Sequence, residues 1–388
     1  MSAETLGVDL LREVKEEGLD ELLHSLRELE NSSSAPLSFP PLDRLLNVFQ
    51  NQPTTRQQQL CHTQWPTEHH EVQQVPPILK EKPPPVIEIT GATACSGKTQ
   101  LLYHIVSISL LPSNYKDIFS FGKGHAVVLF DLSSKFSILR LRDIMHGRVS
   151  SICSMGSLKI PSQELSSMIS ECLINLHIFR PQESSSFIST LDGLSSYLLA
   201  QTPTHFSTNC PLGILAINDL SSFLWQDRLD ADEEPGLSTN HMKEKANNNL
   251  LLQRYRTLVL SLRHMQRLFS CTIVATNRGL TPITSVASHR ALRPQLPSIW
   301  NNFCTVKVVV ERVRVPKFGP GMSAEEAVTE KEQRWEAVEK SGFAGWVNWW
   351  RSEDWKEEVR EGLRTLERGG SFSFQVLEEG IVVADNDS

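Results

Sequence analysis

The sequence lacks the features that mark secreted, zinc-binding and membrane-spanning proteins. Its seven cysteines are an odd number and form no Cys-x-x-Cys pair, which disfavours a disulfide framework or a zinc site and favours a reducing compartment. No apolar run approaches the roughly eighteen residues of a membrane span. The N-terminus has no basic segment followed by an apolar one. We therefore expect neither secretion nor membrane insertion.

Positive charge is also scarce. Lys and Arg number 38 against 45 Asp and Glu, and the formal net charge is -7. Strong, sequence-independent binding of nucleic acid usually needs a basic domain or an extended basic patch on the surface. Any contact with DNA is therefore expected to be local, or shared with partner chains.

The composition changes along the chain divide it into five segments. Residues 1–30 predict an amphipathic helix with four leucines on one face, and residues 31–85, rich in Ser, Gln, His and Pro, predict a flexible linker. Residues 86–316 alternate strands with helices, with strands expected at 86–89, 126–130, 173–179, 212–217 and 271–276. This alternation predicts an α/β core with a mostly parallel twisted sheet and helices on both faces. Residues 371–388 supply closing strands and a tail.

Residues 317–370 form a charged insert that is rich in tryptophan. Trp346, Trp349 and Trp350 have the spacing of one helical face. Two interpretations stay open: a surface on which a partner docks, and a local pair of helices that packs its own tryptophans.

A strand, a glycine-containing turn and a helix follow one another at residues 86–111, and the turn ends in Gly97-Lys98-Thr99. In a P-loop, backbone N–H groups and the helix N-terminus hold the phosphates, the lysine reaches the β- and γ-phosphates, and the threonine binds Mg²⁺. We therefore predict that Gly91, Ser96, Gly97, Lys98 and Thr99 bind ATP.

The spacing of this turn departs from the usual pattern. Gly91 lies one residue too far from Gly97, and the place of the first glycine falls on Ala92. An alanine strains a turn that needs a glycine.

A P-loop ATPase also needs an acidic residue at the end of a neighbouring strand. The strand at 212–217 is followed by Asn218, a poor cation ligand, and then by Asp219. Alternation along the strand turns Asp219 to the other face. Asp219 is therefore either a substitute Mg²⁺ ligand or simply a cap or turn residue.

These residues give the chain a resemblance to the eukaryotic RecA-type recombinase paralogues of homologous recombination. Four stretches carry it: Gly97-Lys98-Thr99-Gln100-Leu101-Leu102-Tyr103-His104, residues 128–141, residues 220–228 and residues 273–277. The resemblance covers roughly 86–315 and resumes at 371–384. It implies a RecA-like P-loop ATPase core, a nuclear protein, and partners that are paralogous RecA-type subunits.

Three catalytic positions depart from the family pattern. The resemblance implies a catalytic glutamate where this chain has Ser133, a Mg²⁺ aspartate where it has Asn218, and a γ-phosphate-sensing glutamine where it has Arg278. Loss of one transition-state contact commonly lowers a rate by about two to three orders of magnitude. We therefore expect nucleotide binding with weak or no hydrolysis.

The family's two DNA-facing loops fall at about 226–240 and 279–299. The first is acidic, and the second offers only Arg290 and Arg293 as arginines, so DNA is expected to bind weakly or through the complex.

The favoured hypothesis is a subunit of a recombinase-paralogue complex in double-strand-break repair. An active DNA-dependent ATPase and an unrelated P-loop small-molecule kinase are the alternatives. The helix at 1–30 then either packs on its own core or docks on another chain.

Overall fold

The computed structural model describes residues 36–50, 83–115, 120–156, 160–200, 210–233, 240–280, 291–313, 321–339 and 341–383. The helix predicted at 1–30, most of the predicted linker, Arg290 and the last five residues lie outside these ranges.

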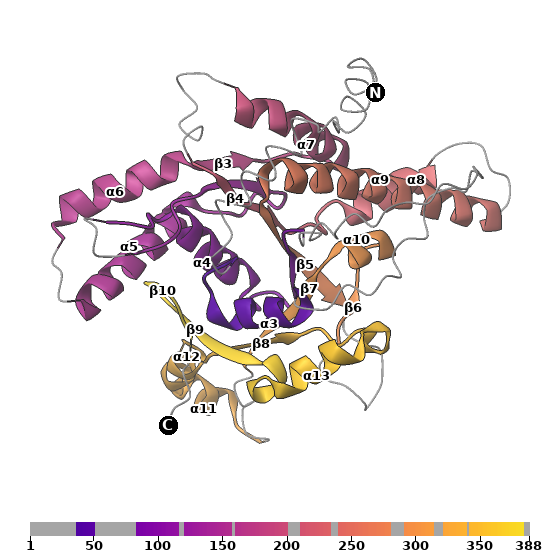
Figure 1. The fold of residues 1–388 in the computed structure, drawn as a ribbon. Helices are drawn as coiled ribbons and strands as arrows, with labels where there is room; N and C mark the ends of the chain where they lie inside the picture. Colours follow the sequence, from indigo (N-terminus) through magenta and orange to yellow (C-terminus); the bar gives the residue numbers. More distant parts are fainter. Residues whose placement is uncertain are drawn as a thin grey trace, which may run out of the picture.

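The predicted α/β core is present as one large, mostly parallel sheet (Figure 1). Five strands run parallel at its centre and on one side of it: β1 (Val86–Gly91), β2 (Ala126–Asp131), β3 (Leu176–Phe179), β4 (Leu212–Asn218) and β5 (Thr272–Leu280). A sixth, β7 (Val306–Arg312), pairs in parallel with β1. Each was expected from a short apolar run, and the burial of β1, β2 and β4 on both faces explains why their runs are nearly continuous.

The sheet order is β10-β9-β8-β7-β1-β5-β4-β2-β3, with the two-residue β6 (Arg293–Pro294) paired to the end of β5. The strands β8 (Phe343–Val347), β9 (Phe372–Leu377) and β10 (Gly380–Val383) are antiparallel and extend the sheet beyond β7. The parallel strands place the carboxyl ends of β1, β2, β4 and β5 at one edge, where ligands bind in open α/β sheets.

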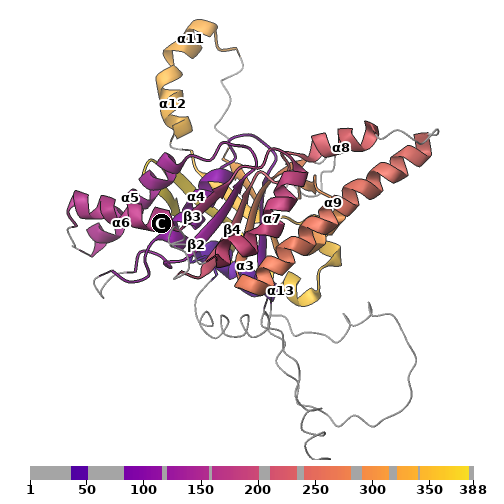
Figure 2. The same cartoon turned by 90° about the horizontal axis from the view of Figure 1, so that it is seen from above.

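Helices cover both faces of the sheet and bury one core on each (Figures 1 and 2). One core contains side chains from α3 (Pro40–Gln50), α4 (Lys98–Leu110), α5 (Ile138–Met155), α6 (Ser162–Ile174) and α13 (Glu357–Thr365). The other contains side chains from α7 (Ser184–Leu199), α9 (Asn240–Phe269) and α10 (Ser298–Phe303). Strand β1 contributes side chains to both cores, because Ile87 and Ile89 lie in the first core and Val86 lies in the second.

Helix α3 corrects the prediction that residues 31–85 are all linker. Leu42, Leu45 and Leu46 are each 1% exposed and belong to the first core. The buried Asp43 carboxylate accepts hydrogen bonds from the backbone N–H groups of Leu37 and Phe39, at 3.0 and 2.8 Å, and so fixes the chain entering the helix. The prediction missed α3 because it is a short amphipathic segment within a polar stretch of sequence. Its leucines are buried only by packing on the sheet.

Strand β8 corrects the interpretation of residues 317–370 as an insert that lies outside the core. Val308 to Arg312 of β7 pair with β8, which in turn pairs with β9. Trp346 therefore lies on a strand and Trp349 and Trp350 follow it, rather than forming one helical face. Within the described part of this segment, α11 (Ala324–Thr329) and α12 (Lys331–Glu339) project away from the sheet (Figure 2).

Candidate functional site

The glycine turn joins β1 to α4 at the carboxyl edge of the sheet, as the sequence predicts. Lys98 is the first residue of α4, Thr99 is the second, and Gly97 caps the helix with a φ of 93°. Cys95 is also left-handed, with a φ of 57°. Alternating left-handed residues of this kind turn successive backbone N–H groups toward one point, a concavity that suits an anion.

The glycines of the turn are needed for close packing. A Cβ built on Gly91 would lie 2.3 Å from Ser96 Oγ, and one on Gly97 would lie 2.8 Å from the Phe343 ring. Ala92 is absent from the described residues with positive φ, so the strain expected there does not arise. The turn therefore tolerates the unusual spacing by placing its left-handed residues at Cys95 and Gly97.

Lys98 lies at the centre of a charged group. Its ammonium donates to Ser96 Oγ at 3.0 Å. Burial lowers the pKa of Lys98, the Asp219 carboxylate acts to raise it, and the Arg278 guanidinium lowers it further. Two cations and one carboxylate thus lie near the mouth of the loop, a net positive site suited to phosphate.

Asp219 reaches this site by leaving the strand. Strand β4 ends at Asn218, and Asp219 has a φ of 60°. Its backbone N–H donates to Thr276 Oγ1 at 2.8 Å, and its carboxylate accepts a hydrogen bond from Ser221 at 2.8 Å. Side chains alternate between the two faces of the sheet only within a strand, and Asp219 lies beyond the end of β4 with a left-handed backbone. The alternation therefore does not turn the Asp219 carboxylate away from Lys98, whose pKa it raises.

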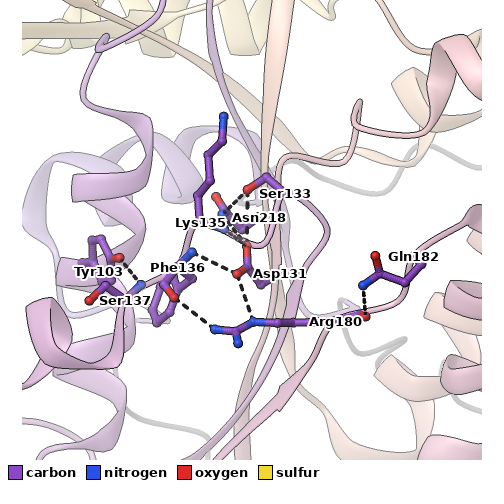
Figure 3. Close-up of polar contacts among 9 residues, drawn as sticks. All are labelled: Tyr103, Asp131, Ser133, Lys135, Phe136, Ser137, Arg180, Gln182 and Asn218. Carbon is purple, nitrogen blue, oxygen red and sulfur yellow. Dashed lines mark hydrogen bonds and ion pairs between the residues drawn. The ribbon is translucent and has the colours of Figure 1, made fainter.

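Asp131, Ser133 and Asn218 form a closed hydrogen-bond network at the ends of β2 and β4 (Figure 3). The Asn218 amide donates to Asp131 Oδ1 at 3.0 Å and to Ser133 Oγ at 3.1 Å, and the Ser133 hydroxyl donates to Asp131 Oδ1 at 3.3 Å. Thr276 donates to the Asn218 carbonyl at 3.1 Å. Every polar atom of the Asn218 amide group is therefore occupied by protein.

The other carboxylate oxygen of Asp131 is held from the opposite side. Phe136 N–H donates to it at 2.9 Å, and Arg180 Nε lies 3.4 Å away (Figure 3). Asp131 is 0% exposed. Its charge is thus compensated inside the fold, and it organises the turn after β2. Arg180 was not identified from the sequence, because only the pairing of β2 with β3 brings it here.

The structure describes part of each of the two DNA-loop segments. The first begins as helix α8 (Leu224–Glu233), in which Asp227 is 4% exposed and bound by Arg254 at 2.7 Å, so this carboxylate is not free to repel phosphate. In the second, Arg293 is exposed on β6. Among the described helices none is long and apolar enough to cross a membrane, and no three His, Cys, Asp or Glu side chains of the described ranges cluster to hold a metal ion.

Comparison with known proteins agrees with this architecture. No protein-family model matches the chain. The chain is 24% identical over 266 residues to a protein of Arabidopsis thaliana called DNA repair protein XRCC2 homolog, which covers 58% of this chain and 68% of that protein. It is 27% identical over 168 residues to the DNA repair protein XRCC2 of Mus musculus, across 43% of this chain and 51% of the mouse protein. Together with the parallel sheet and the glycine turn before α4, these similarities support an XRCC2-like RecA-type recombinase paralogue.

Proposed function

We propose that the chain is a subunit of a recombinase-paralogue complex that repairs DNA double-strand breaks by homologous recombination, and that its P-loop binds ATP with weak or no hydrolysis. The similarity to proteins named for DNA repair supports the first part. The observation that carries the second part is the closed network of Asp131, Ser133 and Asn218.

The phosphate loop fits a nucleotide. ATP would place its phosphates at the N-terminus of α4, where Gly97 N–H and the Lys98 ammonium would compensate their charge. The Thr99 hydroxyl would hold Mg²⁺, with Asp219 as a further ligand in place of Asn218. Burial of Lys98 beside Asp219 and Arg278 supports this assignment, because a desolvated lysine gains most from an anionic ligand.

Hydrolysis needs a group that orients an attacking water, and this part of the chain offers none. Ser133 occupies the position of the glutamate, and its hydroxyl is engaged with Asp131 and Asn218. Asp131 is fully buried and bound by Phe136 and Arg180. Asp219 is partly exposed and its charge acts on Lys98, so it suits the metal better than the water.

The remaining parts of the proposal follow from the family and from charge. A net charge of -7 argues against a broad basic surface, so the chain would act on DNA together with paralogous RecA-type subunits, in the nucleus. An active DNA-dependent ATPase remains the alternative and requires a base that Ser133 does not supply. An unrelated small-molecule kinase is disfavoured by the similarity to DNA repair proteins.

Nucleotide binding and turnover are tested separately. We expect a fluorescent ATP analogue to bind the wild-type chain and the Lys135→Ala control, whose exposed lysine lies near the site, and to bind Lys98→Ala much more weakly. Phosphate release should stay near background with and without single-stranded DNA. Rapid turnover that Lys98→Ala abolishes would establish the active ATPase instead.

Assembly is tested by sizing the purified chain alone and with candidate paralogues. A stable one-to-one heterodimer that survives Lys98→Ala is the expected result. Long filaments of this chain alone on single-stranded DNA would refute a role as an accessory subunit.

A further inference from the structure

A groove of about 490 Å³ lies between the end of α4 and helix α6 (Figure 1 shows both helices). Three of its lining residues, Gly124, Asn175 and Cys210, stand just before β2, β3 and β4. The groove is therefore at the edge of the sheet opposite the phosphate loop, and the proposed nucleotide site does not use it. Its volume falls within the roughly 300–1,000 Å³ of ligand sites.

The walls of the groove are largely apolar. Leu110 is the last residue of α4, and Met168 and Cys172 lie one turn apart on α6. The Tyr115 hydroxyl donates to Glu164 Oε1 at 2.5 Å, which ties the chain after α4 to α6 and holds the walls together. An apolar groove between two helices is the kind of surface that accepts the apolar face of a third helix.

The described part of the chain begins beside this groove. Its first residue, Pro36, accepts a hydrogen bond at its carbonyl oxygen from the Lys123 ammonium, at 2.7 Å. Lys123 directly precedes Gly124 of the groove, so Pro36 lies within the length of one lysine side chain of the lining. This position is fixed, because Leu37 is 1% exposed and its N–H donates to the buried Asp43 carboxylate. The segment before Pro36 is thus tethered next to the groove.

That segment carries an apolar face of matching type. Residues 1–30 predict a helix with leucines at the i, i+3, i+4, i+7 spacing of helices that bind in grooves, namely Leu19, Leu22, Leu23 and Leu26. Residues 31–35 join it to Pro36 and reach at most about 20 Å when extended. So short a tether gives an effective concentration on the order of millimolar. The segment of the same chain is therefore favoured over a free partner.

The charge at the rim of the groove also fits this segment. The lining holds two carboxylates, Glu164 and Glu171, and the first accepts the Tyr115 hydrogen bond. Glu171 is exposed. Arg27 stands four residues after Leu23, beside the leucine face, where it can pair with Glu171.

We propose that residues 19–29 form a helix that packs its leucines into the groove between α4 and α6 of the same chain. Burial of one leucine shifts an equilibrium about tenfold or more, so several leucines together would keep the groove covered. Residues 201–209, which lead into Cys210, contain a single large apolar side chain, Phe206, and fill such a groove less well. The proposal goes beyond the proposed function and does not depend on nucleotide binding.

Thiol labelling of the full chain tests the proposal. Cys210 lines the groove and is partly exposed, so N-ethylmaleimide should reach it slowly while the segment covers it. Joint substitution of Leu23→Glu and Leu26→Glu should raise its labelling rate at least about 10-fold, measured by mass spectrometry of proteolytic peptides. Cys95, exposed in the phosphate loop, is the internal reference and should react equally in all variants. Leu10→Glu, on the opposite side of the same predicted helix, is the matched control.

Substitutions in the groove give the reciprocal measurement. Met168→Glu should speed hydrogen exchange in residues 19–29, whereas Ser166→Glu, at an exposed position outside the groove on α6, should not. Glu171→Arg should speed this exchange by only about 2- to 5-fold, because an exposed ion pair contributes little. Addition of Arg27→Glu to Glu171→Arg should restore the protection, since the pair is re-formed with its charges exchanged.

Two results would overturn the proposal. The first is unchanged labelling of Cys210 in the leucine double variant, and faster labelling in Phe206→Ala would then assign residues 201–209 as the cover. The second is loss of paralogue binding by the double variant with unchanged labelling of Cys210, which would assign the segment to a partner chain. The double variant should bind the ATP analogue like the wild type, so nucleotide binding is judged separately. A cooperative urea transition shows that each variant is folded.

Discussion

The buried histidine on α4 predicts that acid destabilises this protein. His104 is 7% exposed and its ring packs edge-on against Phe39, with 5.4 Å between centroids. Burial lowers the pKa of His104 from 6.5 to about 3, and the Arg148 guanidinium contributes to the same shift. The folded protein therefore holds His104 neutral, whereas the unfolded chain protonates it near pH 6.5.

The sign and size of the effect follow from proton linkage. A histidine whose pKa is lowered on folding binds more protons when unfolded, so the free energy of unfolding falls as pH drops below 6.5, and continues to fall until about pH 3. Each pH unit in that window costs about 1.4 kcal/mol. Acidification from pH 7 to pH 5 should therefore remove about 2 kcal/mol through His104 alone.

The comparison of wild type with His104→Leu isolates this contribution, since other groups titrate equally in both. Urea unfolding at pH 7 and pH 5 should show the wild type losing about 2 kcal/mol more than His104→Leu. His146→Leu, at an exposed position on α5, is the matched control and should behave like the wild type. If His104→Leu and wild type lose equal stability on acidification, the histidine is solvated in the folded state and the reasoning fails.

Three substitutions test individual contacts. Gly97→Ala should abolish binding of a fluorescent ATP analogue and lower the free energy of unfolding by about 2 kcal/mol, because Gly97 has a φ of 93° and Phe343 leaves no room for a Cβ. Its control is Thr93→Ala, at an exposed position in the same turn. Leu42→Ala should cost about 3 kcal/mol in urea unfolding, because α3 is core and not linker. Asn218→Asp should cost about 3 kcal/mol at pH 7 without restoring phosphate release, because it places a second carboxylate 3.0 Å from Asp131.

Local patterns predicted the parallel part of the sheet well. The apolar runs at 126–130 and 212–217 became β2 and β4 with almost the same bounds, because a strand buried on both faces needs a continuous apolar run. Strand β8 was missed because Phe343 to Val347 is too short for periodicity to separate strand from helix. The segment becomes a strand because it pairs with β7 and β9, which are distant from it in the sequence.

The candidate site was likewise predictable where its residues are neighbours in sequence, and not where distant segments meet. Lys98 and Thr99 were placed correctly at the start of α4, because the residues that shape the turn are neighbours in sequence. The direction of Asp219 was not predictable, since it depends on a left-handed backbone held by Thr276 from β5. The contact of Phe343 with Gly97 was not predictable either, because it joins the phosphate loop to a segment outside the family resemblance.

Strand β8 connects the phosphate loop with the segment that precedes β6. Its first residue, Phe343, packs on Gly97, and the side-chain oxygen of Asn348, which directly follows its last residue, accepts a hydrogen bond from Leu292 N–H at 3.0 Å. Phe343 and Asn348 are about 16 Å apart along a strand that rises about 3.3 Å per residue. The Phe343 ring also stacks on Phe374 at 5.3 Å and lies 5.6 Å from the Arg312 guanidinium.

This arrangement predicts different consequences for three variants. Phe343→Ala removes a side chain that is 8% exposed and should cost about 3–5 kcal/mol in unfolding. Because Phe343 packs on Gly97, the variant should also weaken binding of the ATP analogue, as Lys98→Ala should, whereas Trp335→Ala, at a position 70% exposed on α12, should change neither quantity. Titration of the ATP analogue and urea unfolding of each variant measure this. Normal binding of the ATP analogue by Phe343→Ala would mean that the turn keeps its shape without support from β8, and the reasoning would fail.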